Sequence, residues 1–236
     1  EKERRIGFPV TPLLSRRAQL TPGGTWLAAR LALEHGYAAN TAGGSHHALH
    51  HTGAGYCVFN DLAIAAHRLL AEGDARRILI VDCDVHQGDG TASLLASRED
   101  VATYSIHAAK NFPARKARST LDVPLPDGTD DQAYLDALAL TLPPMIDSVR
   151  PDLILYQAGV DPHADDRLGR LALTDDGLRQ RDLYVAEQAR RRDIPLASTP
   201  GGGYGHDKAA IAARHAATIV ALGSALAGYP AAMDPI

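Results

Sequence analysis

Apolar residues recur along the chain in two alternating patterns, which are short buried runs and longer stretches with helical spacing. The runs RILIV, VATYSI and LILY are rich in β-branched and aromatic residues, as is typical of strands buried on both faces. The stretches between them place apolar residues three or four positions apart, which predicts helices. We expect strands at 37–42, 76–85, 101–107, 152–159 and 194–203. We expect helices at 60–73, 89–97, 130–149, 174–192 and 207–228.

The regular alternation of strands and helices indicates the fold class. Strands connected by helices of about a dozen residues or more run parallel, and helices then cover both faces of the sheet. We therefore expect an α/β fold in which residues 1–236 form one domain around a central, mostly parallel sheet. The helix at 130–149 contains Pro143 and Pro144, which are expected to kink or interrupt it.

Reactive side chains are concentrated where the expected strands end. In open α/β sheets, ligands bind in the crevice outside the carboxyl ends of the strands. Four of the expected strands deliver polar residues to this edge of the sheet, so we expect these residues to form one site. They are His46, His47, Asp82, Asp84, His86, Asp89, Asp161 and Tyr204.

One group of these residues has the composition of a metal site. Asp82, Asp84 and His86 are two positions apart and share one face of an extended backbone. Together with Asp161 from a neighbouring strand end, Asp84 and His86 provide two carboxylates and one imidazole. This donor set suits a divalent metal ion that keeps positions open for water and substrate, as catalytic zinc sites do.

Composition and charge narrow the choice of function. Of the 236 residues, 45% are apolar, and the formal net charge of -4 gives no electrostatic reason to expect nucleic acid as a partner. We expect no membrane span, because no apolar run reaches the roughly 18 residues required, and no secretory signal is seen before the fold. Cys57 and Cys83 both have apolar neighbours, which favours reduced thiols and a cytoplasmic location over a disulfide.

Five motifs resemble those of the zinc-dependent histone deacetylase family, which has the arginase-like deacetylase fold. In chain order they are GGSHHALHHTGAGYCVFND, VDCDVHQGDG, YSIH, QAGVD and PGGGY. The resemblance extends from about residue 21 to about residue 228, and DRLGRLALTDDGLRQRD is most similar to small class IV and bacterial deacylases. The chain departs from the family in two respects. The family's N-terminal segment, with a first strand and a rim loop, is expected to be absent, and the metal loop reads His-Gln-Gly-Asp where many members have His-His-Gly-Asp.

The resemblance implies two kinds of metal site. Asp84, His86 and Asp161 would be the ligands of a zinc ion. A structural potassium ion would be held by the Ser105 side chain with backbone around four further residues. Those four residues are Asp82, Asp84, His86 and Ile106.

The resemblance also implies which residues act on the substrate. His46 and His47 would be paired active-site histidines, oriented by Asp82 and Asp89 respectively, and Tyr204 would polarise the scissile carbonyl. An imidazole paired with a carboxylate is fixed in tautomer and made more basic. We assign His47 as the general base and expect His46 to tune the charge of the site. The residues that contact the substrate would be Gly55, Tyr56 and Phe112.

The hypothesis that follows is a zinc-dependent deacetylase or deacylase. It would use metal-activated water to remove acetyl or longer acyl groups from lysine side chains of a protein or peptide, or from a small acylated amine. An acylpolyamine amidohydrolase would share nearly every catalytic residue, so this alternative stays open. A non-catalytic acyl-lysine binding module has no need for a general base such as His47. An arginase-like manganese hydrolase needs more carboxylates for its two-metal site.

Overall fold

The strands form one parallel sheet. The computed structural model describes residues 2–227. Its strands are β1 Tyr37–Ala39, β2 Ile78–Asp82, β3 Val101–Ala108, β4 Leu121–Leu125, β5 Leu153–Gln157 and β6 Leu196–Thr199. They lie side by side in the order β1, β6, β5, β2, β3, β4, and every neighbouring pair is parallel.

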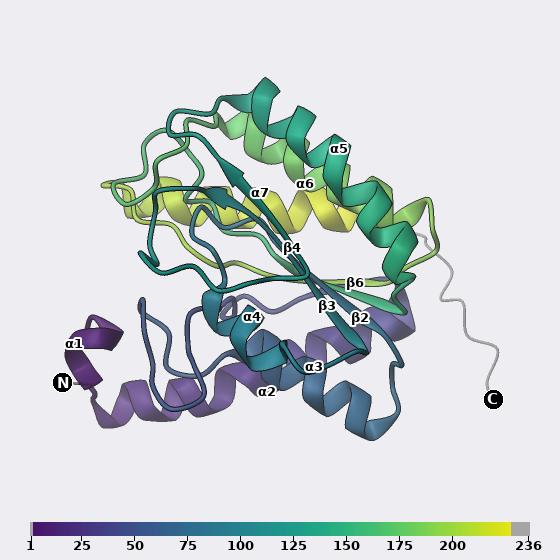
Figure 1. The fold of residues 1–236 in the computed structure, drawn as a ribbon, viewed down its shortest axis with the longest axis horizontal. Coiled ribbons are helices and arrows are strands. Elements are labelled where there is room, and N and C mark those ends of the chain that lie inside the picture. The colour runs from purple at the N-terminus through teal and green to yellow at the C-terminus, as the bar shows by residue number, and fades with distance from the viewer. Residues whose placement is uncertain (1, 228–236) are drawn as a thin grey trace.

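Helices cover both faces of this sheet, which confirms the expected fold class. Figure 1 shows α2, α3 and α4 on one side of the strands and α5, α6 and α7 on the other, with the short α1 beside the start of α2. The helices are α1 Lys2–Ile6, α2 Pro12–His35, α3 Asp61–Glu72, α4 Asp89–Leu95, α5 Asp131–Val149, α6 Asp175–Arg190 and α7 Lys208–Leu226.

Residues of β2 alternate between two hydrophobic cores. Leu79 and Val81 pack on the side of α5, α6 and α7, whereas Ile78 and Ile80 pack on the side of α2 and α3. All four side chains are fully buried, and each such burial contributes about 1.5–3 kcal/mol to folding. The apolar run of β2 therefore reflects its position inside a doubly covered sheet.

The long helix α2 was not expected from the sequence. It contains Pro22, Gly23 and Gly24, which usually mark a helix end, yet it spans 24 residues. Thr11 caps the N-terminus of the helix, because its hydroxyl oxygen accepts a hydrogen bond from the Leu14 N–H at 3.1 Å. Packing of its alanine-rich face against α3 and the sheet overrides the low helix propensity of the central triplet.

Prolines account for one missed strand and one wrong expectation. Pro124 lies in β4, which is an edge strand and therefore tolerates a residue that lacks an N–H. Pro143 and Pro144 lie inside α5, but this helix continues unbroken from Asp131 to Val149. The expected interruption of this helix was wrong.

The apolar character of α7 was underestimated. This helix has 19 residues and a mean hydropathy of 1.4, so by length and composition alone it could cross a membrane, contrary to the expectation that no run is long enough. Arg214 and His215 interrupt the run in the sequence and hid this property. In the structure α7 packs beside α6, and the Thr218 hydroxyl donates a hydrogen bond to the buried Asp182 carboxylate at 2.6 Å.

The register of the inner strands aligns the carboxyl ends of β2 and β5. Asp82, the last residue of β2, pairs with Ser105 of β3 on one side and with Gln157 of β5 on the other. The segments that follow β2 and β5 therefore leave the sheet next to each other. This places their polar residues at one edge of the sheet, where such folds bind ligands.

Candidate active site

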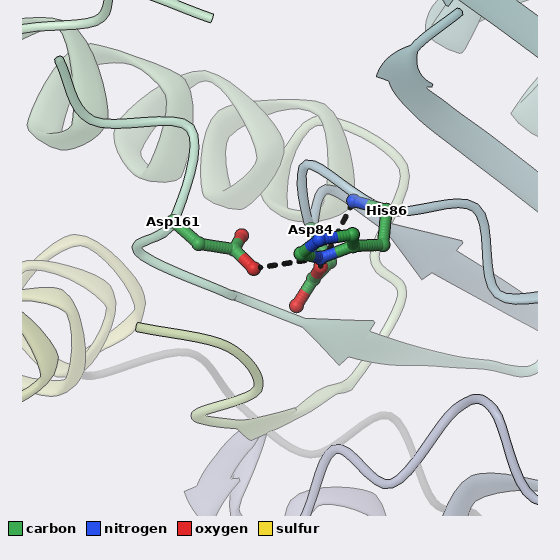
Figure 2. Close-up of side chains that lie close together, drawn as sticks. All are labelled: Asp84, His86 and Asp161. Atoms are coloured by element: carbon green, nitrogen blue, oxygen red, sulfur yellow. Dashed lines mark hydrogen bonds and ion pairs between the residues drawn. The ribbon is translucent and has the colours of Figure 1, made fainter. Parts of the chain in front are cut away.

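Two aspartates and a histidine meet at the carboxyl ends of β2 and β5. Figure 2 shows Asp84 and His86, from the segment after β2, facing Asp161, from the segment after β5. The Nδ1 atom of His86 is 3.0 Å from Asp84 Oδ1 and 3.1 Å from Asp161 Oδ2. One ligand atom from each residue lies within 4.8 Å of the other two, and all three residues are buried.

Electrostatics at this cluster favour a bound cation. Burial and the charge of Asp84 raise the pKa of Asp161 to about 7, because two buried carboxylates at close range repel each other. Burial disfavours a charged His86, but hydrogen bonds to Asp161 and Asp84 outweigh it and raise the pKa of His86 to about 10. Two carboxylates and one imidazole are also a donor set that zinc accepts. The three residues therefore fit a zinc ion.

Backbone and amide groups hold the free oxygens of both carboxylates. Asp84 Oδ2 accepts hydrogen bonds from Gln157 Nε2 and from the Gly202 N–H, each at 2.8 Å. Asp161 Oδ1 accepts one from the Val85 N–H at 2.8 Å. A side chain at Gly202 would collide with both carboxylates, since its Cβ would lie 2.8 Å from Asp84 Oδ2 and still closer to Asp161 Oδ2. The glycine loop after β6 therefore closes the floor of the site. Sequence reasoning missed Gln157, although an amide at the end of an apolar strand was a signal.

A buried arginine, also missed from the sequence, ties the two ligand-bearing segments together. Arg181 of α6 is fully buried, and its Nη1 donates to the carbonyl oxygens of Gly159 at 2.6 Å and Cys83 at 3.3 Å. Its Nε donates to Asp182 Oδ1 at 2.9 Å, and the same oxygen accepts the Tyr156 hydroxyl at 2.6 Å. Since these carbonyls lie one and two residues before Asp84 and Asp161, Arg181 positions both segments that carry the cluster.

The sequence did hold one signal for this arginine. Arg181 lies three positions after Leu178 and four before Val185, so it occupies the apolar face of its helix. Both of those neighbours are buried in the core. A cation at such a position requires an anion and further acceptors inside the protein.

Replacing Arg181 with methionine is expected to destabilise the protein by about 3–5 kcal/mol, because Asp182 would be left as a buried charge without its cation. Chemical denaturation measures this loss. Adding Asp182→Asn to the same chain should recover part of it. The matched control is Arg179→Met on the same helix, where the side chain is 62% exposed, and its unfolding midpoint should barely change. Equal unfolding midpoints for the Arg181 and Arg179 variants would contradict the role of Arg181 in holding the two segments together.

Two histidines stand beside the aspartate and histidine cluster, each with its own carboxylate. His46 Nδ1 is 2.7 Å from Asp82 Oδ2, and His47 Nδ1 is 2.7 Å from Asp89 Oδ1. All four residues are buried, and the two imidazole rings are 4.0 Å apart between centroids. The ring of His47 is 5.7 Å from that of His86. The structure thus pairs each histidine with the carboxylate that the sequence motifs implied.

The two histidines differ in their charge. Burial disfavours the charged form of His46, but the charges of Asp82 and Asp84 outweigh it and raise the pKa of His46 to about 9. Burial and the charge of His46 lower the pKa of His47 to about 4, although the bond to Asp89 opposes this. At neutral pH the pair therefore consists of a charged His46 and a neutral His47, and only the neutral ring can accept a proton.

A cavity of about 430 Å³ leads from the surface to this cluster. Tyr56 and Phe112 line it and are 48% and 46% exposed, so neither is a core aromatic. The ring of Phe112 lies edge-on to His47 at 4.8 Å between centroids, and that of Tyr56 lies 5.5 Å from Tyr204. The cavity also reaches His86. The cavity therefore joins the exposed rings of Tyr56 and Phe112 to the buried cluster of Asp84, His86 and Asp161.

The phenol of Tyr204 lines the same cavity. Burial, reinforced by the charges of Asp84 and Asp161, raises the pKa of Tyr204 far above its usual value, so the hydroxyl stays protonated and can donate a hydrogen bond. Its backbone is anchored, because the Tyr204 N–H donates to Asp166 Oδ2 at 2.6 Å. The residue therefore offers a fixed, neutral donor.

Gly55 lies in the narrow space between His47 and Phe112. Its φ of +51° lies in the left-handed region, and an added Cβ would lie 2.5 Å from His47 Cδ2 and 3.0 Å from Phe112 Cε1. Its N–H donates to the Arg5 carbonyl oxygen at 3.2 Å. The glycine thus lets the backbone border the cavity directly.

The residues expected around a potassium ion also lie close together in the chain's interior. Ser105 is buried and pairs in register with Asp82, and its hydroxyl lies 3.0 Å from His107 Nδ1. The next residue, Ile106, has its side chain in the hydrophobic core, so only its backbone can face an ion.

Comparison with known proteins identifies the family. The family model described as the histone deacetylase domain matches residues 2–220. An uncharacterised protein of Picosynechococcus sp. is 48% identical over 213 residues, covering 90% of this chain and 71% of that protein. Histone deacetylase 2 of Arabidopsis thaliana is 36% identical over 77% of this chain and 48% of its own length. The acetoin utilization protein AcuC of Staphylococcus aureus is 37% identical over 61% of this chain and 40% of its own length.

A solved structure shows the same architecture. The crystal structure of the HDA15 HD domain superimposes with a TM-score of 0.74 over 88% of this chain and 64% of that one, at 24% sequence identity. The chain therefore spans about half or less of the Arabidopsis and Staphylococcus relatives and about two thirds of the HDA15 domain. Since the family model extends over nearly all of the described fold, the chain belongs to the histone deacetylase domain family.

Proposed function

We propose that this chain is a zinc-dependent amidohydrolase that removes acetyl or longer acyl groups from lysine side chains. The observation that carries the proposal is the joining of three features in one cavity. A buried Asp84, His86 and Asp161 cluster lies at its inner end, with a neutral imidazole at His47 and a protonated phenol at Tyr204 beside it. Amide hydrolysis needs these parts, because it requires an activated nucleophile, a charge stabiliser and a proton donor for the leaving amine.

Each residue has a definite task in this reaction. A zinc ion held by Asp84, His86 and Asp161 would lower the pKa of water toward about 7 and polarise the acyl carbonyl. His47 takes a proton at Nε2, because its Nδ1 faces Asp89, and later gives it to the leaving amine. Tyr204 donates its hydroxyl proton in a hydrogen bond to the oxygen on which negative charge develops.

His46 has a different task from His47. Its pKa of about 9 favours the protonated form at neutral pH, which makes His46 a poorer proton acceptor than His47. Its charge lies beside the cluster, with Nε2 at 3.7 Å from Asp84 Oδ1. A fixed positive charge there offsets the two carboxylates and stabilises negative charge that develops during the reaction.

Three other functions compete with this one. An acylpolyamine amidohydrolase would use the same residues. An arginase-like enzyme would hold two metal ions, but within residues 2–227 the structure shows a single group of three potential ligands at this spacing. A non-catalytic binding module would keep the cavity but would not need a neutral base at its inner end.

A substrate screen on the zinc-loaded protein distinguishes these functions. We expect acetyl-lysine or long-chain acyl-lysine peptides to be hydrolysed with higher kcat/KM than acetylated polyamines. Faster hydrolysis of the polyamines would favour the alternative enzyme. Binding of acyl-lysine peptides without turnover, by protein whose zinc content is verified, would favour the binding module.

Tyr56→Ala tests whether Tyr56 and Phe112 form an aromatic wall that contacts the lysine side chain of the substrate. Because the wall contacts the substrate equally before and during the reaction, KM for acyl-lysine peptides should rise more than kcat falls. Each lysine CH₂ that is no longer buried against Tyr56 contributes about 0.8 kcal/mol less binding free energy, so a rise in KM of about fourfold per CH₂ is expected. Hydrolysis of a small ester that is too short to contact Tyr56 serves as the control. Equal losses on both substrates would contradict a role as a wall.

A further inference from the structure

The mouth of the cavity is basic, although the chain as a whole has a net charge of -4. Three cationic residues, Arg5, Lys110 and Arg170, line it. Among the described residues that line this cavity, none is acidic. The positive charge at the mouth is therefore a local feature that the overall composition does not reveal.

Acidic residues close to these cations already have partners. Glu3, two positions before Arg5, accepts a hydrogen bond on its Oε1 from the Val10 N–H at 2.7 Å. Asp127 forms an ion pair with Arg170 at 3.0 Å. Asp166 accepts hydrogen bonds from three backbone N–H groups, two on its Oδ1 and one on its Oδ2. By contrast, the side chains of Arg5 and Lys110 are exposed and have no ion pair or hydrogen bond with any residue between 2 and 227. Two cations at the mouth are thus left for a ligand.

The loop that carries Phe112 is itself rich in cationic residues. Residues 109–120 include Lys110, Arg115, Lys116 and Arg118 but no acidic residue. Lys116 has a structural task, because its Nζ donates to the carbonyl oxygens of Asn111 and Pro113 at 2.5 and 2.7 Å. Arg115 and Arg118 are exposed, and the described part of the chain offers neither a side-chain partner.

We propose that this mouth selects acyl-lysine residues that are flanked by aspartate or glutamate in the substrate peptide. The inference rests on the proposed function, because it places an acyl-lysine side chain in the slot between Tyr56 and Phe112. With the acyl group at the metal cluster, the peptide backbone stays at the mouth, and its neighbouring side chains lie near Arg5 and Lys110. The same two cations disfavour polyamines, whose remaining ammonium groups would meet like charge.

Three peptides test this selection. They carry the same central acetyl-lysine and differ only in whether the two flanking residues are aspartate, alanine or lysine. At about 0.01 M salt, kcat/KM should be about threefold to tenfold higher for the aspartate peptide than for the alanine peptide, and lowest for the lysine peptide. The differences should shrink at about 1 M salt, where charges are screened beyond ~3 Å.

Charge reversal identifies the responsible side chains. In Arg5→Glu/Lys110→Glu, the ratio of kcat/KM between the aspartate and lysine peptides should fall below one. The matched control is Arg76→Glu, an exposed arginine just before the amino end of β2, at the opposite edge of the sheet. This control should keep the ratio of the unaltered protein. Equal kcat/KM for the three peptides, or a preference that survives the double reversal, would overturn the proposal.

A binding measurement separates this inference from the proposed function. Fluorescence anisotropy of labelled peptides reports affinity whether or not hydrolysis occurs. If no peptide is hydrolysed but the aspartate peptide binds most tightly, the deacylase proposal fails and the charge selection stands. If peptides are hydrolysed and bind with equal affinity at low salt, the deacylase proposal stands and the selection is overturned.

Discussion

Replacing Asp161 with alanine is expected to abolish both the bound metal and turnover. Asp161 provides one of three clustered ligand atoms, and the remaining Asp84 and His86 cannot hold a zinc ion in a catalytic arrangement. Loss of a residue that only hydrogen-bonds to a metal ligand typically lowers activity by ~10–100-fold. Loss of a ligand itself should lower turnover by much more than that. Elemental analysis should find one zinc per chain before the change and almost none after it.

A neighbouring carboxylate provides the control for this variant. Asp165 lies four positions later in the same segment, is 72% exposed, and pairs with Arg214 at 3.1 Å rather than with the cluster. Asp165→Ala should retain zinc and activity. Because Asp161 also accepts the Val85 N–H, circular dichroism must verify that the Asp161 variant is folded. Full zinc content in folded Asp161→Ala would contradict the assignment of Asp161 as a metal ligand.

The second large effect is expected at His47. A neutral imidazole with a pKa of about 4 can accept a proton at neutral pH, so His47→Ala should lower kcat by about 10²–10⁴-fold. His46→Ala should cost less turnover, because His46 is already protonated. Steady-state kinetics on an acyl-lysine peptide measures both losses.

Zinc content and a nearby histidine make this comparison specific. Both variants should keep the metal, since neither histidine belongs to the cluster of ligand atoms. His50→Ala is the matched control, because His50 lies in the same loop, is exposed, and contacts the ring of His51 rather than the cluster. A larger loss at His46 than at His47 would show that the assigned roles are reversed.

Much of the fold could be predicted because its signals are local. The β2 run ILIV is apolar on both faces, and Asn60 and Gly73 flank α3 as typical capping residues. Placing polar residues at strand ends follows from the geometry of parallel sheets, so the meeting of Asp84 with Asp161 could be anticipated. Such inferences need only the sequence near each residue.

Other features depend on contacts that the sequence does not display. Pro22 and its two following glycines lower the helix propensity of α2, and only packing against α3 and the sheet reveals the helix. The apolar-face position of Arg181 indicates that it is buried but not what it binds, since the carbonyls that it contacts come from the distant segments after β2 and β5. The charge difference between His46 and His47 likewise arises from burial and neighbouring charges, which exist only in the folded chain.

Stoichiometric zinc titration tests the central claim most directly. Metal-free protein would be supplied with increasing zinc while acetate release from an acetyl-lysine peptide is measured at each step. If one zinc ion held by Asp84, His86 and Asp161 supports hydrolysis, activity should rise in proportion to zinc and level off at one equivalent per chain. Acetate release at full rate without any metal, or a plateau only at two equivalents, would contradict the account.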